Sequence, residues 1–296
     1  MSWSEGLVNT DPAYMIAGSS NSRVRVVAGP GTGKSFAMKR RIARLLEHRV
    51  EPSSILPVTF TRVAATDLHR ELVGIGVPGC DELRAFTLHS LALKILMRNS
   101  VLKAIGRVPR TLNEFELEPF VSDLARDHGG KTKTRELIGA YEAAWARLQH
   151  EDPGYAPTAE DQSFAQDLVS WMVFHEAMLI GEVVPFLHGY LISNPAATER
   201  TEFTHILVDE YQDLNRAEQE LITLLSDTAD VCIVGDDDQS IYSFKHAHPE
   251  GIRDWLTVNA GAEDLGLDDC RRCPTLVVNM ANNLISWNQL RPGNCQ

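Results

Sequence analysis

Residues 24–35, Val-Arg-Val-Val-Ala-Gly-Pro-Gly-Thr-Gly-Lys-Ser, decide how this chain folds. An apolar run predicts a buried strand, a glycine-rich turn follows, and the next residues have helical spacing. Residues 28–35 match the eight-residue pattern G-x-x-x-x-G-K-[ST] except at the first position, where Ala28 replaces glycine. This pattern is typical of a phosphate-binding loop, because glycines let successive N–H groups point at a phosphate. A chance glycine loop is the alternative, and the flanking strand and helix argue against it.

The loop pattern predicts a bound nucleoside triphosphate with Mg²⁺. We expect Lys34 to reach the β- and γ-phosphates, and the Ser35 hydroxyl to bind the metal. The helix that follows adds its positive dipole end. The residues expected to bind the nucleotide are Gly29, Pro30, Gly31, Thr32, Gly33, Lys34 and Ser35.

Composition is that of an ordinary globular protein. The chain has 296 residues, 44% hydrophobic and 23% charged, which is enough for two domains. A net charge of −12 argues against a surface coated with basic residues but allows a local basic groove. Five scattered cysteines are typical of a reducing compartment. With no signal-peptide pattern and no membrane-spanning apolar run, we expect a soluble cytoplasmic protein.

Short apolar runs alternate with helical patterns, which predicts an α/β fold with a parallel sheet. Besides the strand before the loop, we expect strands at residues 55–59, 83–87, 206–208 and 231–234, and helices at residues 36–48, 63–73 and 88–97. Residues 100–180 show only helical spacing, at residues 115–124, 137–148 and 164–179, with breakers at residues 129–131 and 152–154. This pattern predicts a helical domain inserted into the α/β domain.

Two of the apolar runs end in acidic residues. In open parallel sheets, ligands bind at the carboxyl ends of the strands. Asp209 is therefore a candidate Mg²⁺ ligand, and Glu210 a candidate general base for an attacking water. Gln239, in the loop after residues 231–234, is a candidate sensor of the γ-phosphate. A helix N-cap for the two acids and an ordinary loop amide for Gln239 are the alternatives.

Six stretches resemble motifs of the UvrD/Rep family of superfamily 1 DNA helicases. In chain order, residues 28–35 are similar to motif I, residues 58–65 (VTFTRVAA) to motif Ia (TFTNKAA), residues 87–91 (TLHSL) to TFHSL, residues 208–215 (VDEYQDLN) to motif II (VDEYQDTN), residues 234–244 (VGDDDQSIYSF) to motif III (VGDDDQSIYSW), and residues 267–285 to motif IV.

The resemblance implies a P-loop, RecA-like domain 1A formed by residues 1–99 and 181–285. It also implies an inserted helical domain 1B at residues 100–180 and the start of a second motor domain at residues 286–296. ATP and Mg²⁺ are the implied cofactors. The implied activity is 3′-to-5′ movement on single-stranded DNA driven by ATP hydrolysis, as in DNA repair. Motifs V and VI of the second motor domain are absent from this sequence, so we expect an incomplete enzyme.

The resemblance also implies roles for individual residues. The implied catalytic residues are Lys34, Asp209, Glu210, Gln239 and Arg272. Single-stranded DNA contacts fall to Phe60, His89, Tyr242 and Phe244, and Arg62 adds a cation where the family has an asparagine. Aromatic faces stack on any base at about 1–3 kcal/mol each, which suits a protein that tracks any sequence. Core packing is the alternative for the two phenylalanines.

The chain departs from the family pattern around the nucleotide base. Phe36 stands where the family usually has an arginine, and Arg271 where it has a stacking tyrosine. We interpret this as an exchange that keeps one aromatic and one guanidinium face for the base. The adenine-reading glutamine has no counterpart in residues 8–13, so adenine specificity is open.

Cys270 and Cys273 form a C-x-x-C pattern, which elsewhere marks zinc or redox chemistry. No second C-x-x-C accompanies it, and a ligand set with Cys295 is incomplete. Cys273 matches the family's serine.

Two other functions compete with a helicase. One is a nucleotide-dependent switch that binds DNA or protein without motor activity. DNA-stimulated turnover in a longer chain would separate a motor from a switch. The other is a P-loop kinase, which is disfavoured because Asp209 and Glu210 offer a hydrolytic base and the sequence has no lid or acceptor signature.

Overall fold

One parallel sheet organises most of the chain in this computed structural model, which describes residues 2–149 and 158–287. Its strands are β1 (Arg23–Ala28), β2 (Ile55–Val58), β3 (His205–Val208), β4 (Asp230–Gly235) and β5 (Glu263–Leu267). They lie in the order β2-β3-β4-β1-β5, and every pair is parallel. The predicted α/β fold with a parallel sheet is confirmed.

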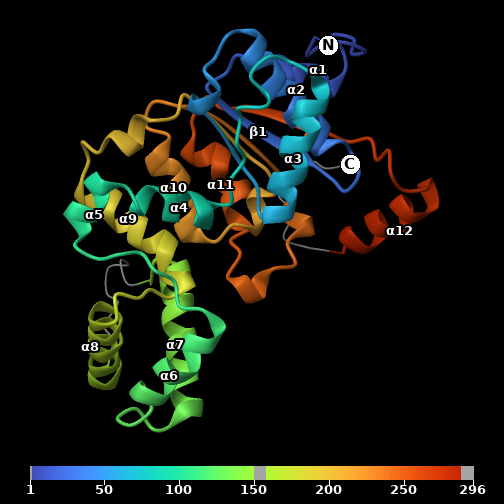
Figure 1. Cartoon of the computed structure of the whole chain (residues 1–296). Helices are drawn as coiled ribbons and strands as arrows, with labels where there is room; N and C mark the ends of the chain where they lie inside the picture. Colours follow the sequence, from blue (N-terminus) through green and yellow to red (C-terminus); the bar gives the residue numbers. More distant parts are fainter. Residues whose placement is uncertain (1, 150–157, 288–296) are drawn as a thin grey trace.

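The two faces of the sheet carry separate apolar cores, because alternate strand residues point in opposite directions. In β4, Cys232 and Val234 belong to one core, and Val231 and Ile233 to the other. The first core is covered by α1 (Pro12–Gly18), α2 (Lys34–Glu47) and α3 (Arg62–Ile75), and the second by α4 (Leu88–Leu96), α9 (Val183–Ser193), α10 (Arg216–Leu225) and α11 (Glu250–Val258) (Figure 1).

A third core belongs to helices that stand away from the sheet (Figure 1). After α5 (Asn99–Ile105), the chain forms α6 (Glu114–Leu124), α7 (Lys131–Ala146) and α8 (Ala159–Phe174). Phe120 and Phe164 are fully buried at the centre of this group. Side-chain caps define two of the helix starts: Asn113 and Glu116 cap each other's backbone at α6, and Thr158 and Asp161 do so at α8.

Two predicted elements were wrong. Residues 83–87 do not form a strand, because only Phe86 pairs with β2, at Val58, and Thr87 then caps α4. The helix expected at residues 164–179 ends at Phe174. Glu176 has a left-handed backbone (φ 47°), and Met178 pairs instead with Thr111. The breaker expected at residues 152–154 lies outside the described residues.

The sequence patterns missed β5 and five helices: α5, α9, α10, α11 and α12 (Thr275–Ile285). β5 is an edge strand of Glu, Asp, Leu, Gly and Leu, so it lacks the β-branched residues that usually mark strands. Short 3-10 turns join other elements, at Pro52–Ser54, Ile180–Glu182, Thr198–Thr201, Tyr211–Asp213, Asp237–Gln239 and Ser243–Lys245.

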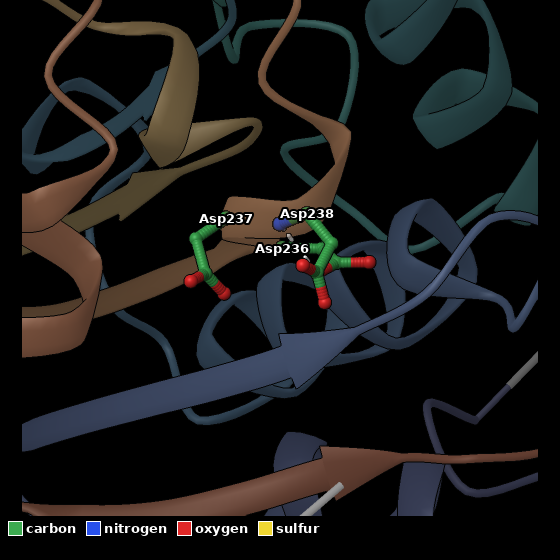
Figure 2. Close-up of side chains that lie close together, drawn as sticks. All are labelled: Asp236, Asp237 and Asp238. Atoms are coloured by element: carbon green, nitrogen blue, oxygen red, sulfur yellow. Dashed lines mark hydrogen bonds between the residues drawn. The ribbon is translucent and has the colours of Figure 1, made fainter. Parts of the chain in front are cut away.

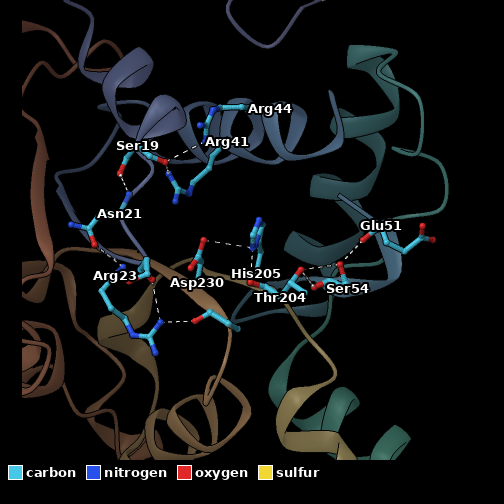
Figure 3. A network of polar contacts seen from close by, with 12 residues as sticks. Ser19, Asn21, Arg23, Arg41, Arg44, Glu51, Ser54, Thr204, His205 and Asp230 are labelled. Carbon is cyan, nitrogen blue, oxygen red and sulfur yellow. Dashed lines mark hydrogen bonds and ion pairs between the residues drawn. The ribbon is translucent and has the colours of Figure 1, made fainter. Parts of the chain in front are cut away.

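A polar network holds the amino ends of the strands (Figure 3). Arg41 of α2 is buried and donates to the carbonyl oxygens of Ile16 and Ser19, at 2.8 and 3.0 Å. Arg23 at the start of β1 donates to the Ser226 carbonyl at 3.1 Å. Burial lowers the pKa of His205, which lies 3.9 Å from the Asp230 carboxylate. These contacts lie at the opposite strand ends from the phosphate loop, so we assign them to the fold.

A buried ion pair joins the helical group to α9. Arg107 Nη1 donates to Glu182 Oε1 at 2.9 Å, and their side chains are only 9% and 10% exposed. Burial raises the pKa of Glu182, and Arg107 opposes that rise. No helix in the described part of the chain is both long and apolar enough to cross a bilayer.

Replacing Arg107 by leucine should therefore destabilise the protein. The change leaves Glu182 buried without its cation, and loss of one partner of a buried pair costs about 3–5 kcal/mol. Urea unfolding measures the loss. Arg126→Leu is the control, because Arg126 is 77% exposed and lies 3.6 Å from Asp123, so its loss should cost less than about 1 kcal/mol. Equal losses in the two variants would contradict the prediction.

Candidate nucleotide-binding site

The phosphate loop connects β1 to α2 at the carboxyl edge of the sheet. Gly31 and Gly33 have positive φ angles of 72° and 103°, which favour glycine. Thr32 is buried and donates its hydroxyl to the Gly29 carbonyl at 2.9 Å, which ties the turn together. The helix then begins at Lys34, and Ser35 follows exposed on its first turn.

Lys34 meets two other motifs in one place. Its Nζ lies 2.8 Å from Glu210 Oε2 and 3.5 Å from Gln239 Oε1. Glu210 follows β3 with a left-handed backbone (φ 52°, ψ 45°), which is uncommon for a residue other than glycine and typical of functional sites. The structure thus brings together the loop lysine, the candidate base and the candidate γ-phosphate sensor.

Asp209 is the most perturbed acid of this group. It is half-buried at the end of β3, and its Oδ1 accepts the Glu210 backbone N–H at 3.0 Å. Burial, and then the charge of Glu210, raises the pKa of Asp209 to about 6. A half-buried carboxylate and a serine hydroxyl are hard oxygen donors that suit Mg²⁺, and a divalent cation would compensate the partly desolvated charge. Asp209 and Ser35 therefore fit a magnesium site.

Gln212 links the candidate base to the next strand, and the sequence reasoning missed it. Its side chain is buried, with Nε2 donating to Glu210 Oε2 at 3.0 Å and Oε1 accepting the Asp236 N–H at 3.0 Å. A Cβ on Gly235 would lie 2.3 Å from Gln212 Oε1, so only glycine fits there. The available signal was a polar residue within the short run after a buried strand.

The three acids after β4 organise the loop that carries Gln239. One carboxylate oxygen from each of Asp236, Asp237 and Asp238 lies within 4.8 Å of the others (Figure 2). Asp236 accepts the Gln239 amide at 2.8 Å and the Asp238 backbone N–H at 3.1 Å. Gln239 also donates to the Ala28 carbonyl at 3.3 Å, which joins this loop to the end of β1.

The residues that resemble motif IV sit directly on the phosphate loop. The Arg271 N–H donates to the Gly31 carbonyl at 2.9 Å. A Cβ on Gly31 would lie 2.5 Å from Arg272 Cβ, so the glycine is needed for this approach. A pocket of about 360 Å³ lies between the loop and α12. Both arginines are exposed.

Phe36 already has a guanidinium partner that the sequence reasoning missed. The Arg40 guanidinium lies 5.0 Å from the centroid of its ring, one helical turn along α2. Phe36 remains 37% exposed. The predicted pairing of Phe36 with Arg271 around a base stays a prediction.

A separate aromatic cluster gathers the residues predicted to contact DNA. The Tyr242 ring centroid lies 4.9 Å from that of Phe60 and 5.8 Å from that of Phe244, and Phe244 is 70% exposed. Lys245 Nζ lies 4.9 Å from the Phe60 centroid and 5.3 Å from that of Tyr242. Lys245, which the sequence reasoning missed, adds a cation to this platform.

The two other predicted DNA contacts lie on α3 and α4, which cover opposite faces of the sheet. His89 Nδ1 on α4 lies 3.3 Å from Glu218 Oε1 on α10. Arg62 is exposed at the first position of α3, after the Thr61 N-cap.

Known proteins similar to this chain are DNA helicases. Residues 9–256 match the UvrD/REP helicase N-terminal domain. DNA helicase II of Escherichia coli (strain K12) is 31% identical over 290 residues, covering 92% of this chain and 39% of that protein. ATP-dependent DNA helicase PcrA of Staphylococcus aureus (strain Mu50) is 28% identical over 303 residues, covering 96% of this chain and 40% of that protein. The chain therefore spans about two fifths of the length of these relatives.

The raised pKa of Asp209 predicts that Asp209→Asn stabilises the protein without metal at neutral pH. As pH rises from about 4 to 6, the unfolded carboxyl ionises before the folded one, so the wild type loses stability. Above pH 6 the loss is constant, at most about 3 kcal/mol for a shift of about two pH units. The asparagine variant has no such loss. Urea unfolding in EDTA at pH 4 and 7.5 measures the difference, and a less stable variant at pH 7.5 would contradict the prediction.

Proposed function

Since this chain belongs to the UvrD/REP helicase family and carries its N-terminal domain, we propose that it is the ATP-binding part of a 3′-to-5′ DNA helicase. The longer protein would couple ATP hydrolysis to movement along single-stranded DNA. The observation that carries the proposal is the convergence of Lys34, Glu210 and Gln239 beside the phosphate loop. These side chains supply a cation, a base and a neutral sensor where the β- and γ-phosphates would lie.

Each of these residues would have a separate role in hydrolysis. The loop N–H groups bind the phosphates, and Lys34 neutralises charge on the β- and γ-phosphates. Glu210 takes the proton of the attacking water, and Gln212 holds its carboxylate by the 3.0 Å hydrogen bond. Ser35 and Asp209 would hold Mg²⁺, which supplies positive charge against the transferring phosphoryl group.

The remaining nucleotide contacts come from the edges of the loop. Arg272, whose Cβ packs over Gly31, would contact the γ-phosphate, as the family resemblance implies. Phe36 and Arg271 present an aromatic and a guanidinium face to the base.

The single-stranded DNA would pass over the platform of Phe60, Tyr242 and Phe244. Stacking on aromatic faces needs no particular base, and Lys245 together with Arg62 supplies positive charge for the phosphates. His89 on α4 is the other residue proposed to contact DNA. An acidic chain can bind DNA in this way because the cations are local.

We divide the chain as its family motifs suggest. Residues 1–99 and 181–285 form domain 1A, around the sheet, and residues 100–180 form the inserted helical domain 1B. Residues 286–296 would begin a second motor domain, which is the partner needed for translocation.

Two substitutions test the nucleotide site. Lys34→Ala should weaken binding of a fluorescent ATP analogue at least about tenfold, or 1.4 kcal/mol, because it removes the cation facing the phosphates. Glu210→Gln should keep binding but lower phosphate release in the longer protein about 10²–10⁴-fold. Lys39→Ala is the control, because Lys39 lies on the same helix and pairs with Glu71 at 2.7 Å.

Retained hydrolysis in Glu210→Gln would remove that residue from the role of base. Nucleotide binding without DNA-stimulated hydrolysis in the longer protein would favour the switch function instead.

Loss of the Phe244 ring tests the DNA platform. Phe244→Ala should weaken single-stranded DNA binding by about 1–3 kcal/mol, because one stacking face is lost. Fluorescence anisotropy with a labelled oligonucleotide at fixed salt measures the change. Phe115→Ala is the matched control, since Phe115 is 88% exposed on α6 in the helical group. An equal loss in both variants would place the DNA elsewhere.

A further inference from the structure

We propose that Cys270 and Cys273 form a redox site, in which a peroxide joins the two thiols in a disulfide and thereby weakens nucleotide binding at the adjoining loop. The formation of the disulfide is independent of the proposed function. The effect on nucleotide binding rests on it.

The two thiols lie at the nucleotide site. Both side chains are half-buried and line the 360 Å³ pocket together with Gly29, Pro30 and Thr32 of the phosphate loop. Cys270 Sγ lies 3.3 Å from the point that a Cβ on Gly31 would occupy. The thiols therefore contact the loop from a pocket that a small oxidant can enter.

The surroundings of Cys270 favour its thiolate. Hydrogen bonds from the backbone N–H groups of Cys273 and Arg272 lower the pKa of Cys270, and contact with the Cys273 side chain and the charge of Arg272 add to this. Cys80 and Cys232 differ, because both are buried and burial raises the pKa of each. The thiolate is the nucleophile in thiol oxidation, so Cys270 should react before these two cysteines.

The chemistry needs one peroxide molecule for each disulfide. The Cys270 thiolate attacks a peroxide oxygen, the O–O bond breaks, and hydroxide leaves and is protonated to water. The Cys273 sulfur then attacks the sulfur of the sulfenic acid, and the S–O bond breaks. The Cys273 proton leaves with that oxygen as a second water. Two electrons pass from the sulfur atoms to the peroxide, and two intervening residues are the spacing of known redox pairs.

A disulfide here would act on the residues assigned to ATP. Arg271 and Arg272 lie between the two cysteines, and the Arg271 N–H and Arg272 Cβ rest on Gly31. The disulfide removes the negative charge of the Cys270 sulfur, which accepts the Arg272 and Cys273 N–H groups, and the closed ring restricts the backbone of both arginines. The oxidised loop should therefore bind ATP about tenfold more weakly, or about 1.4 kcal/mol.

Peptide mapping tests the disulfide. The full chain with Cys295→Ser, which removes a third thiol from competition, is treated with hydrogen peroxide, alkylated and digested with trypsin. Trypsin cleaves after Arg271 and Arg272, so a disulfide holds two peptides together. We expect this linked pair in the parent chain and a dimedone-trapped sulfenic acid at Cys270 in Cys273→Ser. Absence of the linked pair, or earlier oxidation of Cys80 and Cys232, would overturn the redox site.

Nucleotide titration tests the consequence. A fluorescent ATP analogue should bind about tenfold more weakly after oxidation, and dithiothreitol should restore the affinity. In the control Cys273→Ser, peroxide should neither form this disulfide nor cause the reversible loss of affinity. Unchanged affinity with a mapped disulfide would overturn the regulatory role. If the reduced chain binds no nucleotide, the proposed function fails together with the affinity effect, and the peptide map still decides the redox site.

Discussion

The common edge at which the parallel strands end is the constraint on which the site depends. Val27 of β1 is in register with Gly235 of β4, and Ile233 of β4 with Val208 of β3. The phosphate loop, Gly235 and Asp209 therefore leave the sheet at nearly the same level, with β4 in the middle. Buried apolar side chains on both faces fix this register, because a shift by one residue would turn each face toward the wrong core.

Most of the fold could be predicted from the sequence, because its signals are local. The β1 strand, the glycine loop and α2 follow from apolar runs and from glycines that need positive φ angles. β5 could not be predicted in this way, since its Glu, Asp and Gly residues form a strand only because β1 offers an unpaired edge. Residues 83–87 were predicted to be a strand but are not one. Only Phe86 pairs with a strand, and the next residue, Thr87, already caps helix α4.

The candidate site also contains residues that could be predicted from the sequence and residues that could not. Lys34, Asp209 and Glu210 could be identified because each chemistry requires a residue type at a fixed distance from a strand. Gln212 and Arg40 could not, because their partners come from three-dimensional contacts: Gln212 bonds both Glu210 and the Asp236 backbone, and Arg40 covers Phe36. The contact of Cys270 with Gly31 likewise could not be predicted from the sequence, because the two residues are far apart along the chain.

The Lys34–Glu210 ion pair has a consequence for timing. While Lys34 Nζ donates to Glu210 Oε2 at 2.8 Å, the lysine cation is paired with a carboxylate and not with a phosphate. An arriving triphosphate would compete for the lysine, and success in that competition would release the carboxylate at the same moment. Under the proposed function, occupancy and readiness for hydrolysis would then be a single event, because the ion pair that the triphosphate breaks is the one that holds the proposed base.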